Sequence, residues 1–524
     1  MKRFLSLCLA LVMLLALVAC GGDKPATSGA PSNPSNPSSP AAPSRTKLVY
    51  PLTGIGKSMD PHATTMSVDM MVTEQVYEGM HHIKEDGTLE PCLATGYEIS
   101  ADGLTYTYKL RQGIKFHNGD PVTVEDVVYS FQRCIDNKYR GSWLPNLTAV
   151  EAIGTDAVKF TLSAPNAVFE TSMNMVPVVC KKVVEEMGDN FALQVSEAGS
   201  GPYRFVSYDP NNKIVLEANP DYWRGEAAIK TIEYVIITDA AARLMALESG
   251  DIDFSAVSAN DLAIVQANKN LVVEPVTARA TYFIALNTRN DKSPLYDKRV
   301  RQAIAYCVNK EDIIAIAVSG QAVVADTFVS PSIPDAPKNE EMPLRYTRNI
   351  EKAKALLKEA GYPNGFEMTI SCGGGTYIPI SEVFLENLAE IGIKATIQNG
   401  EKASLLSDAQ TNPETVYDTF PFGWSWGVSY NEYAGWYRSD AEHLPHAYQN
   451  KEFDQALVDS MKVDALAAKS LEARKAGWAK LDEYLTDFCA IIPLYNTINN
   501  QVWNKDLNAV TYSLRPYFYD WSWK

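Results

Sequence analysis

The chain has 524 residues, of which 46% are hydrophobic and 21% are charged, and its formal net charge at pH 7 is -16. These proportions are typical of globular domains, and the length suits two or three of them. The acidic excess argues against nucleic acid as a partner, because neutralising a phosphate backbone requires clustered lysine and arginine.

The first residues predict a lipoprotein signal peptide. Lys2 and Arg3 precede an apolar run over residues 4–19, which is shorter than the roughly 20 apolar residues that a membrane-spanning helix needs. The run ends in the letters LVACG, which resemble a bacterial lipobox. We expect residues 1–19 to be the signal peptide and Cys20 to carry a lipid anchor. An ordinary cleavage site beside an incidental cysteine is the alternative.

A segment without a packing pattern follows. Residues 21–44 are nearly all Pro, Ser, Ala, Asn, Gly and Thr, and prolines stand at every third position from Pro31 to Pro43. Such a composition buries little apolar surface and favours extended polyproline II backbone. We therefore interpret residues 20–44 as a lipidated cysteine with a Pro/Ser-rich tether, and we begin the folded body at residue 45.

The body mixes short strands with amphipathic helices. Period-two alternation predicts half-buried strands over residues 104–110, 158–162 and 232–236. Three helices are predicted by their apolar stripes and caps: one that begins after Thr123, one over residues 349–360 that ends at Gly361, and one over residues 471–488. The fold class is therefore mixed α/β.

The cysteines of the body do not form a metal-binding pattern. They are widely separated, without a CxxC or Cys/His spacing, so we expect no zinc site and no other cofactor. Export permits disulfides, but a body of this size does not require them, and the spacing leaves their pairing open. The six positions are Cys92, Cys134, Cys180, Cys307, Cys372 and Cys489.

One long motif and several short ones resemble a known family. Residues 116–131 read FHNGDPVTVEDVVYSF and look like the signature of the peptide/nickel class of bacterial extracellular solute-binding proteins. Shorter matches occur in the family's order, and together they are far more specific than one motif alone. They lie at residues 58–62, 199–203, 219–223, 249–253, 286–288, 299–304, 353–361 and 492–494.

Most of these motifs also have a structural interpretation, which we prefer. Residues 118–121 (Asn-Gly-Asp-Pro) have the composition of a turn before the cap at Thr123, and residues 199–202 predict another tight backbone passage. We expect His117 to be a hydrogen-bonded scaffold residue rather than a ligand-binding one.

The resemblance implies a two-lobed periplasmic-binding-protein-like α/β fold of type II, with three subdomains and a hinge between the lobes. We expect lobe I to contain residues 45–284, as two subdomains, together with a C-terminal return over residues 494–524. Lobe II would cover residues 285–493, with crossovers near residues 283–287 and 492–495. Closure of such lobes on a solute is what an importer recognises.

The same resemblance implies the function. The chain is expected to be a monomeric, lipid-anchored receptor on the outer face of the cell membrane or its periplasmic side. It would capture a short peptide or similar small solute and deliver it to the permease subunits of an ABC importer. It would carry out no chemistry, so we assign no catalytic residue.

The binding site is expected at a Trp-rich loop over residues 423–432. In peptide-binding members, this loop carries an aspartate that pairs with the ammonium group of the peptide, since an unpaired buried charge is costly. Here the corresponding residue is Ser429, followed by Tyr430, Asn431 and Glu432. Glu432 or Asp418 could replace the aspartate, or the solute could lack a free ammonium.

Aromatic and glycine residues complete the predicted site. Trp424, Trp426 and Tyr430 are expected to face the solute, because flat rings offer a large contact area at low entropic cost. Residues 373–375 are glycines after a predicted strand and would let backbone approach a ligand closely. The predicted ligand-binding residues are Trp424, Trp426, Ser429, Tyr430, Asn431, Glu432, Gly375 and Tyr377.

Three alternatives remain open. The same fold could bind an oligosaccharide, given the aromatic density, or a nickel or metal chelate, given that His443 and His446 are three residues apart. A secreted hydrolase is an alternative of another class. It finds no support in sequence motifs, because no GxSxG elbow, HExxH helix or Walker loop occurs.

Overall fold

The computed structural model describes residues 45–524 except 57, 65, 140–143, 145, 167, 402–403, 406–417, 426, 428, 434–435, 438–444 and 469. The predicted signal peptide, Cys20 and the tether lie outside these residues. No helix in the described part of the chain is both long enough and apolar enough to cross a membrane.

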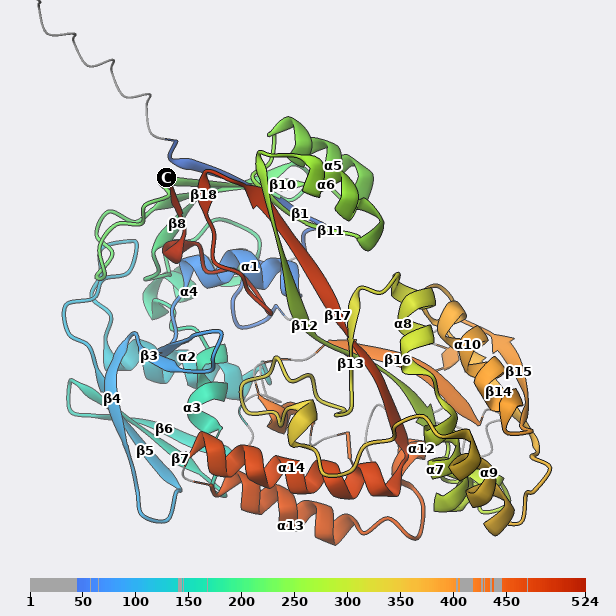
Figure 1. The fold of residues 1–524 in the computed structure, drawn as a ribbon. Coiled ribbons are helices and arrows are strands. Elements are labelled where there is room, and N and C mark those ends of the chain that lie inside the picture. Colours follow the sequence, from blue (N-terminus) through green and yellow to red (C-terminus); the bar gives the residue numbers. More distant parts are fainter. Residues whose placement is uncertain are drawn as a thin grey trace, which may run out of the picture. The chain divides into compact units, whose positions relative to one another are not determined.

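Two antiparallel or mixed sheets form the first part of the body (Figure 1). One sheet has the order β1-β10-β9-β8, in which β1 is parallel to β10, and the other has the order β4-β5-β7-β6. Helices α1 to α4 pack with them. The strands are β1 (Lys47–Leu52), β4 (Ala94–Ile99), β5 (Thr105–Leu110), β6 (Leu147–Ile153), β7 (Ala157–Leu162), β8 (Tyr203–Asp209), β9 (Lys213–Ala218) and β10 (Thr231–Ile236). The helices are α1 (Ser67–Val76), α2 (Val124–Asp136), α3 (Phe169–Ser172) and α4 (Lys181–Met187).

A third, larger sheet continues through the rest of the body. Its order is β11-β17-β12-β16-β14-β15, and β13 also pairs with β17. The strands are β11 (Phe254–Val257), β12 (Leu271–Leu286), β13 (Ala322–Val324), β14 (Glu367–Cys372), β15 (Lys394–Asn399), β16 (Thr419–Ser425) and β17 (Ile491–Asn504). In Figure 1, α5 and α6 lie near one end of the long β12–β17 pair, and α7 to α10 lie near the other.

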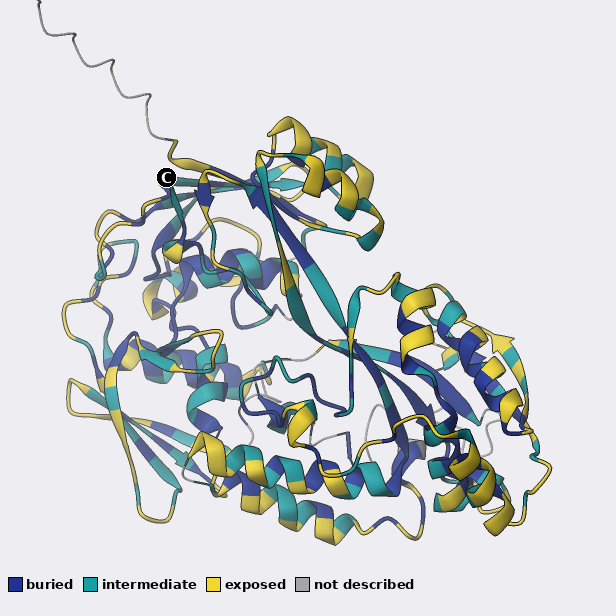
Figure 2. Cartoon of the chain, in the orientation of Figure 1, coloured by how far each residue is buried: buried dark blue, intermediate teal, exposed yellow. Residues whose placement is uncertain are grey.

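The remaining helices belong mainly to the part of the chain between β12 and β17. They are α5 (Ala240–Ser249), α6 (Leu262–Ala267), α7 (Lys298–Cys307), α8 (Lys310–Val318), α9 (Ile350–Glu359), α10 (Tyr377–Glu390), α12 (Pro445–Tyr448), α13 (Gln455–Leu466) and α14 (Leu471–Phe488). Helix α14 exposes one side and buries the other, where Trp478, Leu481 and Leu485 lie (Figure 2).

The local predictions for this body are confirmed. The predicted strands correspond to β5, β7 and β10, and two of the predicted helices to α9 and α14. The third is α2, where Thr123 forms a capping box with Asp126: each accepts a hydrogen bond from the other's backbone N–H, at 3.3 Å and 3.0 Å. Gly361 has φ +94° just after α9, which is the left-handed conformation that ends a helix.

The long signature motif is part of the scaffold, as predicted. Gly119 has φ +88°, and its N–H donates to the carbonyl of Phe116 at 2.9 Å. The His117 ring bonds the carbonyl of Gly201 at 3.0 Å. A Cβ on Gly201 would lie 2.7 Å from the carbonyl oxygen of Val76, so only glycine fits this crossing with α1. The six cysteines of the body are buried and form no disulfide with one another.

The core separates into two groups, and β12 and β17 contribute to both. The early part of β12 packs with residues of the first sheets, whereas Phe283 and Ile284 pack in two clusters built from residues between β12 and β17. On β17, Trp503 belongs to the first group and Leu494 to the second. The fold is therefore two-lobed, with this strand pair passing from lobe I to lobe II. The predicted lobe boundaries, at residues 284/285 and 493/494, lie within these two strands and stay a prediction.

The ladder between β12 and β17 is irregular near its middle, where the register shifts twice, and the second shift lies between Tyr282 and Phe283. The first shift lies between Thr277 and Thr281, so the residues between them leave the ladder. Three side chains donate hydrogen bonds to backbone carbonyls there. Ser332 donates to Thr277 at 2.9 Å, Ser330 to Ala278 at 3.0 Å and Asn496 to Ala280 at 3.1 Å. We call residues 277–281 the strand bulge.

The Asn496 amide is expected to be necessary for the strand bulge. It is fully buried and also donates to the Thr281 hydroxyl at 2.8 Å. Asn496→Leu should lower the free energy of unfolding by about 2–3 kcal/mol, because it leaves a buried carbonyl without a donor. Urea denaturation measures this change. Asn211→Leu, in an exposed turn, is the matched control; equal stability of both variants would contradict the prediction.

Candidate functional site

The Trp-rich loop overlaps the end of strand β16, whose last residue, Ser425, lies opposite Ala280 of the strand bulge. Strand β16 pairs with β12 from Thr419 opposite Leu286 to Ser425 opposite Ala280. A Cβ on Gly423 would lie within 2.7 Å of the Tyr282 ring, so glycine is required for the two strands to approach. The last residues of β16 and the loop after it are thus held beside the point where the chain passes between lobes.

Four aromatic rings gather at this end of β16. Trp424 is half-buried, and its ring lies 6.1 Å from that of Phe422 and 4.8 Å from that of Trp436. Tyr377, at the start of α10, is also half-buried and stacks on Phe422 at 6.2 Å with an interplanar angle of 4°. The structure therefore brings the predicted residues Trp424 and Tyr377 to the two sides of one ring. Trp426 lies outside the described residues.

Gly375 lies two residues before Tyr377 in an open position. It has φ +53°, is exposed, and a Cβ placed on it would meet no atom within 4 Å. The glycine is therefore required by its backbone conformation rather than by close packing.

Ser429 does not present its hydroxyl to solvent. It donates to the carboxylate of Asp335 at 2.8 Å, and the N–H of Tyr430 donates to the other oxygen at 2.7 Å. Both Ser429 and Asp335 are buried, and burial raises the pKa of Asp335 although the Tyr430 N–H opposes the shift. A buried carboxylate thus holds the loop, but it comes from residue 335 and its oxygens are already bonded.

Tyr430 is a core residue in this arrangement. It is 0% exposed, stacks on Trp478 at 4.6 Å, and its hydroxyl donates to Asp482. Burial raises the pKa of Asp482 to about 7. Tyr430 therefore supports the loop from within lobe II, and its direct contact with a solute stays a prediction.

The next two predicted residues have different surroundings. Asn431 is half-buried, and its Oδ1 is buried without a hydrogen-bond partner among the described residues. The Glu432 carboxylate lies so close to Gly427 that a Cβ there would be 1.7 Å from it. Asp418 lies at the opposite end of β16, where it accepts the Thr369 N–H at 2.8 Å. It is therefore not placed to replace a carboxylate in the Trp-rich loop.

A cavity of about 120 Å³ lies in lobe I, and sequence reasoning missed it. Its lining comes from α1, from the hairpin of β2 (His81–Ile83) and β3 (Leu89–Pro91), from residues 174–177, and from residues 514–517. Arg279 of the strand bulge lines it too. No local pattern could have revealed a cavity whose walls are more than 400 residues apart in the chain. None of the predicted site residues lines it.

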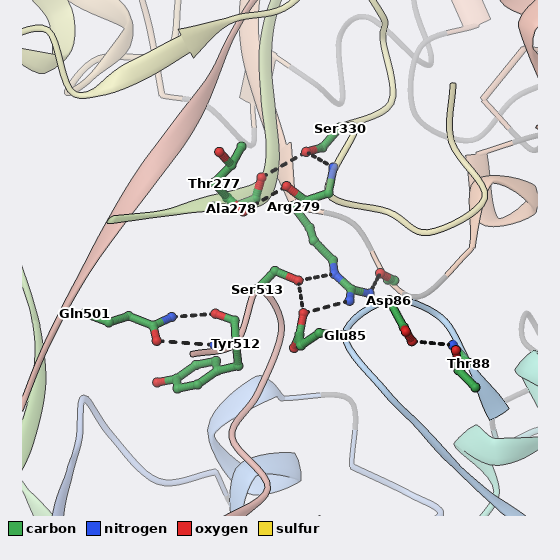
Figure 3. Close-up of polar contacts among 12 residues, drawn as sticks. Glu85, Asp86, Thr88, Thr277, Ala278, Arg279, Ser330, Gln501, Tyr512 and Ser513 are labelled. Atoms are coloured by element: carbon green, nitrogen blue, oxygen red, sulfur yellow. Dashed lines mark hydrogen bonds and ion pairs between the residues drawn. The ribbon is translucent and has the colours of Figure 1, made fainter. Parts of the chain in front are cut away.

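Arg279 connects this cavity with the Trp-rich loop (Figure 3). Its guanidinium donates to the Ser513 hydroxyl at 2.8 Å and to the Gly427 carbonyl at 2.9 Å, and it lies 3.5 Å from Glu85. Burial lowers the pKa of Arg279, while Glu85 opposes the shift. Because Ser513 and Glu85 belong to lobe I and Gly427 to the Trp-rich loop, this side chain contacts both lobes from the bulge.

Comparison with known proteins gives consistent matches. Residues 88–442, more than half of the chain, match the family model described as bacterial extracellular solute-binding proteins, family 5 Middle. Oligopeptide-binding protein AppA of Bacillus subtilis is 27% identical over 490 residues, covering 89% of this chain and 87% of that protein. Heme-binding protein A of Haemophilus influenzae is 31% identical over 386 residues, which cover 67% of this chain and 69% of that protein. The structure of HbpA2 from Haemophilus parasuis matches with a TM-score of 0.82 at 27% sequence identity. The match covers 91% of this chain and 100% of that chain.

The raised pKa of Asp482 makes the support of the Trp-rich loop pH-dependent. The pKa of an aspartate in the unfolded chain is about 3.9, whereas that of Asp482 in the folded protein is raised to about 7. The folded state therefore keeps the Asp482 proton to a higher pH, and the free energy of unfolding falls as pH rises from about 4 to about 7. Asp482→Asn cannot ionise and should gain stability relative to the unmodified protein over this range. Urea denaturation at pH 5 and pH 8 tests this; a difference between the two proteins that does not change with pH would contradict it.

Proposed function

Because this chain belongs to the family 5 bacterial extracellular solute-binding proteins, we propose that it captures a short peptide between its lobes and delivers it to the permease of an ABC importer. Members of this family are binding receptors of ABC importers and not enzymes. The observation that carries the peptide proposal is the junction at Arg279, where the lobe I cavity, the strand bulge and the Trp-rich loop meet.

An extended peptide fits the backbone at this junction. Strand β16 ends at Ser425, which lies opposite Ala280 of the strand bulge. A peptide strand can pair with such backbone, which gives affinity that does not depend on side-chain identity. The half-buried rings of Trp424 and Tyr377 add apolar contact area. A relative that aligns with 89% of this chain is named an oligopeptide-binding protein, which supports the same solute class.

A flat aromatic solute such as heme is the second candidate. A relative of 31% identity is named a heme-binding protein, and stacked rings at Phe422 offer planar surfaces. Among the described residues, no group of three or more His, Cys, Asp or Glu side chains could hold a metal ion. His443 and the His446 side chain, the pair considered for the metal-chelate alternative, lie outside that description. The peptide proposal is preferred because the junction offers the end of a β-strand as well as rings.

The strand bulge is the proposed hinge. The β12–β17 ladder is regular from Leu271 to Thr277 and again from Phe283 to Ala285, and both of its register shifts lie between these stretches, so bending would concentrate there. Rotation there would change the distance between Gly427 and the lobe I cavity. We propose further that Cys20 carries the lipid anchor and that the receptor acts as a monomer.

Replacement of Trp424 should weaken solute binding without unfolding the protein. Trp424→Ala is expected to reduce affinity by about 10- to 100-fold, since a half-buried ring provides much of the contact area. A pool of synthetic tetrapeptides is incubated with the purified protein, retained peptides are identified by native mass spectrometry, and their affinities are measured by calorimetry.

The control is Trp523→Ala on β19 (Ser522–Trp523), where the ring lies against Arg45 in lobe I. This variant should bind peptide like the unmodified protein. Retention of heme but of no peptide would favour the second candidate. Equal peptide affinity of the two tryptophan variants would remove Trp424 from the site.

A further inference from the structure

Two glutamates beside the lobe I cavity are partly exposed, while their arginine partners are buried. The Glu85 side chain is 42% exposed and that of Arg279 only 5%. The Glu74 side chain is 35% exposed and that of Arg515 only 8%. All four residues line the cavity. The arginines are thus more deeply buried than the carboxylates, and the partly exposed charged side chains of the lining are Glu85, Glu74 and Lys84.

Glu85 is held in place by hydrogen bonds that use only one of its carboxylate oxygens. It belongs to the turn of the β2–β3 hairpin, whose tip touches lobe II, because a Cβ on Gly87 would lie 2.3 Å from Pro334. The Ser513 hydroxyl donates to Glu85 Oε2 at 2.6 Å, and Arg279 approaches the same oxygen at 3.5 Å (Figure 3). Glu85 Oε1 has no hydrogen-bond partner in the described part of the chain.

Glu74 is fixed in the same manner from α1. Arg515 donates to its two oxygens, at 2.7 Å from Nε and 2.5 Å from Nη2. A carboxylate has about four acceptor sites, so these two bonds leave capacity for another donor. Lys84 also lines the cavity, but it is half-exposed and lies 3.7 Å from Glu90.

The cavity wall adds two buried acceptors. His81 Nδ1 and Asn174 Oδ1 are buried and have no hydrogen-bond partner among the described residues. Burial lowers the pKa of His81 to about 4, so its ring is neutral at pH 7. In a neutral imidazole one ring nitrogen donates and the other accepts, so Nδ1 can accept a hydrogen bond when the proton is on Nε2. Buried acceptors without partners are costly, and a ligand with N–H groups would satisfy them.

The Trp-rich loop, in contrast, offers no comparable carboxylate where Ser429 lies. The Ser429 hydroxyl and the Asp335 carboxylate bond each other and are both buried. Asp482, the other buried carboxylate near the loop, accepts the Tyr430 hydroxyl within lobe II. A positively charged group on a solute therefore finds its accessible acceptors in lobe I.

We propose that Glu85 and Glu74 form a subsite in the lobe I cavity that receives the ammonium group of the solute, with His81 and Asn174 as additional acceptors. This proposal rests on the function proposed above. It specifies which part of the solute the subsite binds, namely an amino terminus or a lysine side chain. Arg279 and Arg515 are positioning residues, which hold the two carboxylates without contacting the solute. Because Arg279 also bonds Gly427, occupation of the subsite is coupled to the Trp-rich loop.

Three tetrapeptide pools test the subsite on the full-length protein. The first has free amino termini and no Lys, Arg or His; the second is the same pool after N-acetylation; the third is N-acetylated and contains one lysine. The first pool should bind at least about tenfold more tightly than the second, since one charge-assisted hydrogen bond is worth about that factor. Tight binding of the third pool would assign the subsite to a lysine side chain rather than to the amino terminus.

Glu85→Gln should lower the affinity for the ammonium-bearing pool about tenfold and leave binding of the second pool unchanged. Asp86→Asn is the matched control, because Asp86 is the next residue, is fully exposed and bonds only Thr88 in its own turn. As a second readout, salt should weaken the binding of the ammonium-bearing pool to the unmodified protein but not to Glu85→Gln.

The outcomes separate the two proposals. Equal binding of the first and second pools, or equal effects of Glu85→Gln and Asp86→Asn, would overturn the subsite and leave peptide capture intact. Failure of every pool to bind the unmodified protein would overturn both.

Discussion

The fold depends on one long antiparallel pair, β12 and β17, which is shared by two separate cores. Each strand buries residues of lobe I at one end and residues of lobe II at the other. The register of the pairing shifts at the strand bulge and again between Tyr282 and Phe283, and carbonyls of the bulge accept hydrogen bonds from the side chains of Ser330 and Asn496. A continuous ladder would make the lobes one rigid body, and an unpaired crossover would leave them unconnected. In the proposed hinge, bending would concentrate at the bulge.

The polar groups around this point are buried and specifically bonded. Arg279 reaches from the bulge to Ser513 and Gly427, and Asp335 holds Ser429 and the backbone of Tyr430. Buried charges are unfavourable unless they are bonded, so such contacts define one position of the loop more strictly than apolar packing does. The rings of Trp424 and Tyr377 are thereby presented at a fixed place beside the hinge.

Local patterns in the sequence predicted the elements well, but not the contacts between distant segments. The Thr123 cap, the end of a helix at Gly361 and the strand alternation depend on residues within a few positions of one another. The pairing of Ser429 with Asp335, by contrast, joins residues 94 positions apart, and the cavity joins α1 with residues 514–517. The aromatic density of the loop indicated a cleft, but it could not show which rings are accessible. Trp424 is half-buried, whereas Tyr430 is fully buried and stacks on Trp478 of α14.

Hydrogen exchange with and without a saturating tetrapeptide tests the central claim most directly, since it reports where the backbone changes when the lobes enclose a solute. The account predicts slower exchange at residues 278–280 and at Tyr430, with unchanged protection in the ladder from Val272 to Val276 and from Phe283 to Ala285. Protection that increases equally along both halves of β12, or that changes in neither the bulge nor the loop, would contradict it.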